Sequence, residues 1–222
     1  MAEWLQGTEK ILSALLSGDS FMVSQAMREP AIWPLGLVGM LLGAGLILLA
    51  YRVSPWIERN LESSLMVASY LSIGGIIFVE VFRRYLLEVQ APWSTTLPPF
   101  LFLIMTWLGC SLNVKLRTHL GFAEFRNAMP RAGQMACLML DAVLWIGFSW
   151  IVVVTSSKVV ANSAANFQIM LGTDNIMQWW FLMSVPIAFT MLVARVLENV
   201  LIDISKYRSG EQMILRAVIG GD

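Results

Sequence analysis

The sequence predicts an all-α integral membrane protein, and three observations lead to this fold class. Of its 222 residues, 57% are apolar and only 14% are charged, whereas soluble domains average roughly 45–50% and 25%. The mean hydropathy is +0.69. Five nearly uncharged segments are each long enough, as helices, to cross a hydrocarbon core about 30 Å thick. The alternating segments of about ten residues that build membrane barrels do not occur.

The composition also excludes several classes of function. The chain has 15 basic and 15 acidic residues, so it lacks the basic excess of a nucleic-acid-binding protein. Cys110 and Cys137 are too few and too far apart for a zinc site or a disulfide framework. His119 is the lone histidine, which excludes a haem held by two histidines of the chain. With no catalytic motif either, we predict neither an enzyme nor a cofactor.

The first thirty residues predict an amphipathic helix without a secretory signal. Its apolar positions recur at helical spacing and are Leu5, Ile11, Leu12, Leu15 and Leu16. Gly18 and Asp19 end the pattern. Such a helix either lies on the membrane surface or packs on another protein, and both hypotheses stay open.

Five predicted membrane helices follow, at residues 32–51, 64–82, 97–114, 135–154 and 177–195. The count of lysine and arginine alone favours a first segment that does not cross the membrane. Its full, uncharged length favours a segment that does cross. We therefore divide the chain into an N-terminal region, 1–61, and a four-helix unit, 62–222. The N-terminal region holds the amphipathic helix and one extra membrane helix.

The distribution of lysine and arginine predicts the orientation. With five spans, ten basic residues lie on the side of the C-terminus and five on the other side. Because basic residues accumulate in cytoplasmic connections, we expect a cytoplasmic C-terminus and a periplasmic N-terminus.

One acidic residue, Asp141, lies about two turns inside the fourth segment. A charge at this depth is costly and needs a partner or a function. Arg195 lies at a similar depth in the next, antiparallel segment, so we predict a buried Asp141–Arg195 ion pair. The alternative is a cation or proton site at Asp141.

Glycines mark candidate positions of close helix packing. Gly39 and Gly43 form a GxxxG motif in the first span, and Gly36 and Gly45 extend the same small-residue face. Such a face allows two backbones to approach closely. Gly74 and Gly75 in the second span and Gly109 in the third suggest the same role more weakly.

Motifs around the second and third spans add a family resemblance. Arg83, Arg84 and Tyr85 end one span, Pro92, Trp93 and Ser94 open the next, and Gly109, Arg117 and His119 follow in order. This arrangement resembles the small membrane subunit of TRAP (tripartite ATP-independent periplasmic) transporters, whose four-helix layout residues 62–205 match. Thr95 and Thr96 stand where that family often has an acidic pair, which departs from its pattern.

The resemblance implies a scaffold subunit in a bacterial inner membrane. Its implied partners are a large membrane subunit that carries the sodium and substrate sites, and a periplasmic solute-binding protein that delivers organic acids. It implies no substrate site here. It implies structural, subunit-contact or lipid-contact roles for Arg83, Arg84, Tyr85, Trp93, Gly109, Arg117 and His119. Basic residues such as Arg117 at the end of the third span also suit phospholipid phosphates. The alternative is a self-sufficient homo-oligomeric channel or carrier.

Overall fold

The computed structural model describes residues 2–117, 126 and 128–212, and this part of the chain is almost entirely helical. The helices are α1 (Ala2–Ser17), α2 (Ser20–Ala26), α3 (Ile32–Val53), α4 (Pro55–Leu86), α5 (Trp93–Leu116), α7 (Arg131–Ala165), α8 (Trp179–Leu182) and α9 (Ser184–Ser209). Five helical stretches, with α8 and α9 taken together, are long and apolar enough to cross a membrane. The predicted fold class is thereby confirmed. His119 lies outside the described residues.

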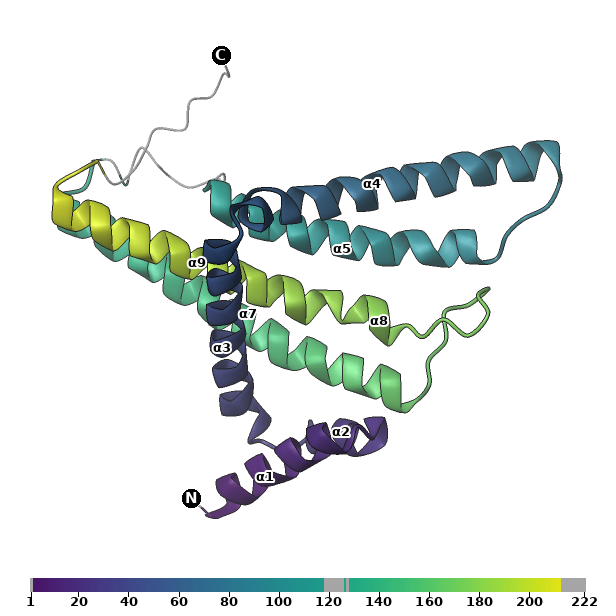
Figure 1. The fold of residues 1–222 in the computed structure, drawn as a ribbon, viewed down its shortest axis with the longest axis horizontal. Helices are drawn as coiled ribbons and strands as arrows, with labels where there is room; N and C mark the ends of the chain where they lie inside the picture. The colour runs from purple at the N-terminus through teal and green to yellow at the C-terminus, as the bar shows by residue number, and fades with distance from the viewer. Residues whose placement is uncertain (1, 118–125, 127, 213–222) are drawn as a thin grey trace.

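The four long helices after α3 form two antiparallel pairs, α4 with α5 and α7 with α9 (Figure 1). Helix ends follow local chemistry. Pro55 occupies the first turn of α4, where its missing N–H costs nothing. Gly210 ends α9 at a φ of 81°, a left-handed conformation that glycine adopts without a Cβ clash. At the end where α9 finishes, α7 and α9 extend beyond α4 and α5 (Figure 1).

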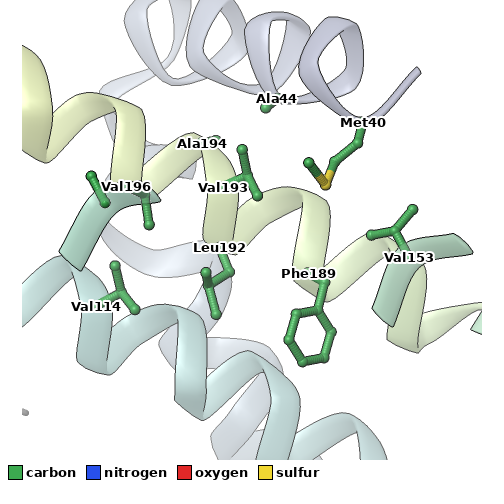
Figure 2. Packing of buried hydrophobic residues seen from close by; sticks show 10 residues of the cluster. Met40, Ala44, Val114, Val153, Phe189, Leu192, Val193, Ala194 and Val196 are labelled. Carbon is green, nitrogen blue, oxygen red and sulfur yellow. The ribbon is translucent and has the colours of Figure 1, made fainter. Parts of the chain in front are cut away.

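The main hydrophobic core surrounds α9. Its buried members are Met40, Ala44, Val114, Ala142, Val153, Phe189, Leu192, Val193, Ala194 and Val196. Val193 points toward the helix that carries Met40 and Ala44, whereas Leu192 and Phe189 point away from it (Figure 2). Half of the most apolar window of α8–α9 is buried inside the chain, against 6% for α4. α9 is therefore the central helix, and α4 lies at the periphery.

α3 crosses α7 and α9 obliquely instead of running alongside them (Figure 1). Small residues permit this close crossing. A Cβ added at Gly36 would lie 2.6 Å from Val154 Cγ2 of α7, and one at Gly43 would lie 3.0 Å from Thr190 Cγ2 of α9. Gly39 has open space around it. Of the predicted GxxxG pair, Gly43 thus makes the close approach, and Gly36 joins it in place of Gly39.

The N-terminal helices pack on the beginning of α3. Ile11 and Ala14 of α1 are buried with Ala26 of α2, Ile32 of α3 and Val154 of α7. Other apolar side chains of this region face outward, namely Trp4, Leu12, Leu15, Leu16, Phe21 and Met22. An amphipathic N-terminal helix is confirmed, and its outer face is free for a membrane or a protein.

The predicted spans are shorter than the observed helices, as α4 and α7 show. α4 begins at Pro55, nine residues before the predicted segment at 64, and continues to Leu86. α7 covers 35 residues. The predicted division between residues 61 and 62 falls inside α4 and stays a prediction. The longer start of α4 matters because it carries Glu58 and Glu62 into the helix bundle.

Candidate functional site

A buried arginine is the centre of the most polar site in the described chain. The Arg195 side chain has no exposed surface, and that of Glu62 is 2% exposed. Arg195 Nε lies 3.0 Å from Glu62 Oε1, and Nη2 lies 3.1 Å from Oε2. This is the two-point geometry in which guanidinium and carboxylate match best.

The remaining donors of Arg195 are also used. Nη1 donates to Glu198 Oε2 at 2.9 Å and to Glu58 Oε1 at 3.3 Å. Nη2 donates to the backbone carbonyl oxygen of Glu58 at 2.8 Å. All five N–H bonds of the guanidinium therefore have an acceptor, which is what a charge away from water requires.

Side chains from neighbouring helices contact the carboxylates of Glu62 and Glu58. Ser111 donates its hydroxyl to Glu62 Oε1 at 2.9 Å, and Tyr51 does so at 3.3 Å. The Tyr51 ring also lies under the guanidinium, 4.0 Å from ring centroid to Cζ. Lys115 Nζ lies 2.6 Å from Glu58 Oε1.

We call this group the Arg195 cluster: Tyr51, Glu58, Glu62, Ser111, Lys115, Arg195 and Glu198. It joins α3, α4, α5 and α9 at one end of the bundle. Each of its three carboxylates and two cations has an oppositely charged partner within the cluster. The cluster therefore couples these helices and presents no unpaired charge to a substrate. A buried pair is weak support for stability but a recognised means of specifying one arrangement.

The predicted Asp141–Arg195 pair is wrong. Asp141 pairs instead with Arg126 at 2.6 Å, and its side chain is 38% exposed. The two residues nevertheless lie at a similar level along the bundle. Arg131 on α7 donates to the carbonyls of Lys206 and Tyr207 on α9. Counting along both helices from that contact brings Asp141 level with Arg195. The two side chains lie on different faces, and Arg195 points toward α4.

Arg117 couples the end of α5 to α9 just beyond the Arg195 cluster. It ends α5 in a left-handed conformation, with φ 54°. Its Nη2 lies 2.8 Å from Asp203 Oδ1 and 3.2 Å from the backbone oxygen of Asn199. Asn199 Nδ2 in turn donates to the Val114 carbonyl at 2.9 Å. The family residue Arg117 is thus a helix-coupling residue in this structure.

The Pro92–Trp93 turn has a structural partner at the opposite end of the bundle. The loop between α7 and α8 crosses it at Gly172, whose φ is 77°. A Cβ at Gly172 would lie 2.5 Å from the carbonyl carbon of Pro92 and 2.6 Å from the Trp93 nitrogen. Thr96 Oγ1 also donates to the Leu171 carbonyl at 2.8 Å. The turn therefore packs against the α7–α8 loop, and Trp93 is 36% exposed.

The other family residues face outward or pack lightly. Tyr85 is 80% exposed at the end of α4. Among the described residues, Arg83 and Arg84 have no acidic side chain within ion-pair distance. A Cβ at Gly109 would meet only Met66 Sδ, at 3.4 Å, and Gly74 and Gly75 have open space. Contacts of these glycines with another subunit stay a prediction.

The described residues contain no group of three or more His, Cys, Asp or Glu side chains that could hold a metal ion. The acidic side chains of the Arg195 cluster are occupied by Arg195 and Lys115 instead.

Comparison with known proteins agrees with the family resemblance. The family described as "Tripartite ATP-independent periplasmic transporters, DctQ component" matches residues 73–206. The sialic acid TRAP transporter small permease protein SiaQ of Vibrio cholerae is 23% identical over 145 residues, which cover 65% of this chain and 82% of that protein. The family match contains Arg195 but begins after Glu58 and Glu62.

Proposed function

Because the chain belongs to the DctQ family, the small permease components of TRAP transporters, we propose that it is the fixed scaffold of such a transporter. A tripartite system implies two partners, a large permease subunit and a periplasmic binding protein. In this proposal the large subunit carries the moving parts and the substrate and sodium sites. The present chain holds that subunit in the membrane.

One observation carries this proposal. The buried charged side chains of the described chain are Glu62, Arg195 and Asp203, and all three lie at the same end of the spans. A path for ions or organic acids needs polar groups at successive depths. The described residues instead give an ion-paired cluster at one end and a largely apolar body. This favours a scaffold over a self-sufficient homo-oligomeric channel.

The peripheral helix α4 is the face we propose for the large subunit. It is the least buried of the candidate spans. Gly74 and Gly75 have nothing within 4 Å of an added Cβ, so a second helix could approach this backbone closely. Tyr85 and Arg84, exposed at the end of α4, would border the same contact.

Our proposal for the transported molecule rests on analogy with a relative. The Vibrio cholerae relative belongs to a sialic acid transporter, and sialic acid is an organic acid. We propose an organic acid as the substrate and sodium as the coupling ion, both bound by the large subunit. We further propose that the chain lies in a bacterial inner membrane. The larger number of lysine and arginine residues on the side of the C-terminus supports a cytoplasmic C-terminus. The Arg195 cluster would then face the cytoplasm.

The function is tested by reconstitution into liposomes with a sodium gradient and the cognate binding protein. We expect uptake only when this chain and the large subunit are both present. Uptake by this chain alone would refute the scaffold role. Full uptake by the large subunit alone would show that the scaffold is dispensable.

The orientation is tested separately, with single cysteines at Ser13 and Ser209 after replacement of Cys110 and Cys137. A membrane-impermeant thiol reagent applied from the periplasmic side should label position 13 and not position 209. Labelling of both positions from one side would refute five crossings.

A further inference from the structure

A cleft with two basic side chains lies between α2 and α7, away from the Arg195 cluster. It has a volume of about 400 Å³ and is lined by Ser24, Met27, Arg28, Lys158, Val159 and Asn162. The volume is within the range of small-molecule sites. Its wall combines two cations, hydrogen-bonding side chains and apolar surface.

Neither cation of this cleft is neutralised by the described chain. No described acidic side chain lies within ion-pair distance of Arg28 or Lys158. The adjacent Glu29 pairs with Lys10 at 3.3 Å instead. This contrasts with the Arg195 cluster, where each cation meets carboxylates. The cleft therefore carries a net positive charge that an anion would offset.

Lys158 is held in position by aromatic side chains. Its Nζ lies 5.3 Å from the centroid of the Trp33 ring, within the range of a cation–π contact. Trp33 packs edge-on against Trp150 with centroids 5.8 Å apart, and Trp150 Nε1 donates to the Trp33 carbonyl at 2.8 Å. A cation fixed in advance loses less entropy when it binds a ligand.

The cleft lies where a membrane would place lipid headgroups. Arg28 precedes the apolar part of α3 by one turn, and Lys158 follows the apolar part of α7 by one turn. Next to it, Phe21 and Met22 of α2 are 59% and 52% exposed. Basic pockets at the ends of membrane helices bind lipid phosphates, and exposed apolar side chains beside them suit acyl chains.

We propose that the cleft between α2 and α7 binds the phosphate group of an anionic phospholipid through Arg28 and Lys158. The bound lipid ties the N-terminal helices to the body of the protein and keeps the outer face of α2 in the membrane interface. This inference concerns residues at the opposite end of the bundle from Arg117, and it does not depend on the large subunit.

The test measures lipid binding to the full-length chain in detergent by native mass spectrometry, with dioleoyl phosphatidylglycerol as the probe. Loss of one cation should weaken binding about fivefold, and Arg28→Gln with Lys158→Gln should weaken it about 30-fold. The matched control is Arg52→Gln with Arg59→Gln, which removes two exposed cations from the other end of the bundle. It should leave the affinity unchanged.

Further arms identify the ligand. Lys158→Arg keeps the charge and should retain binding within about threefold, which separates loss of a phosphate contact from loss of folding. Diacylglycerol, which lacks phosphate, should not bind. Equal lipid affinity in the double variant and its control would overturn the proposal. Inorganic phosphate that displaces the lipid at equal concentration would overturn the lipid as the ligand.

Discussion

Arg195 and Glu62 meet side-on in the interior of the bundle, through two hydrogen bonds of 3.0 and 3.1 Å between guanidinium and carboxylate. The two residues are far apart in the sequence and lie on α9 and α4. Because α4 is otherwise peripheral, this contact and its neighbours at Glu58 fix where α4 stands against the central helix. In the proposed transporter they would thereby position the face that meets the large subunit.

Removal of the charge at Glu62 should be strongly destabilising. Glu62→Gln removes the carboxylate that meets Arg195 through two hydrogen bonds at a buried position, and breaking one side of a buried pair costs roughly 3–5 kcal/mol. Thermal unfolding in detergent should show a large decrease in Tm. Glu9→Gln, at an exposed position of α1, is the control and should leave Tm unchanged. An unchanged Tm in Glu62→Gln would mean that the cluster does not stabilise the fold.

Asp141→Asn should have a small effect, because Asp141 pairs with Arg126 at a partly exposed position. Such pairs contribute about 0.2–1 kcal/mol. In a double-mutant cycle, Asp141→Asn and Arg195→Gln should be additive, whereas Glu62→Gln and Arg195→Gln should show a coupling of about 0.5–3 kcal/mol. Coupling between Asp141 and Arg195 would restore the pair that the sequence predicts.

The sequence predicts the five long apolar helices and their order, because each carries its own hydropathy signal. It also predicts a buried role for Arg195, since a cation inside an apolar segment needs a partner. The identity of the partner depends on which face of α9 turns toward which helix. That face is set by packing among four helices, and no local pattern in the sequence records it.

The sequence does not identify Glu58 and Glu62 as the partners of Arg195, and the reason is clear. Glu58 and Glu62 precede the apolar segment of α4, so hydropathy places them outside the membrane in a connection. Pro55 at the helix start was the available signal that the helix begins earlier. Their spacing of four residues then puts both carboxylates on one face. For a similar reason, the sequence does not show that Gly36 lies against α7. Only the crossing angle of α3 decides which glycines of its small-residue face make contact.

Two glycines of α3 should respond oppositely to alanine. A Cβ at Gly36 would lie 2.6 Å from Val154 Cγ2, and a valine side chain has few alternative rotamers. Gly36→Ala should therefore destabilise the protein by about 1–3 kcal/mol through overpacking. Gly39→Ala has open space and should be neutral or stabilising by up to about 1 kcal/mol. Denaturant unfolding of both variants in detergent distinguishes them, and equal effects would contradict the crossing geometry of α3.

Gly172→Ala should detach the α7–α8 loop from the Pro92–Trp93 turn. The substitution meets two obstacles, a φ of 77° and backbone atoms 2.5 and 2.6 Å from the new Cβ, and backbone atoms cannot rotate away as a side chain can. We expect a loss of about 1–3 kcal/mol and faster cleavage of residues 166–178 by proteinase K. Gly147→Ala, inside α7 with nothing within 4 Å, is the matched control and should leave the cleavage rate unchanged. If Gly172→Ala were cleaved no faster than Gly147→Ala, the loop would not be held by this contact, and the role assigned to the Pro92–Trp93 turn would have to be abandoned.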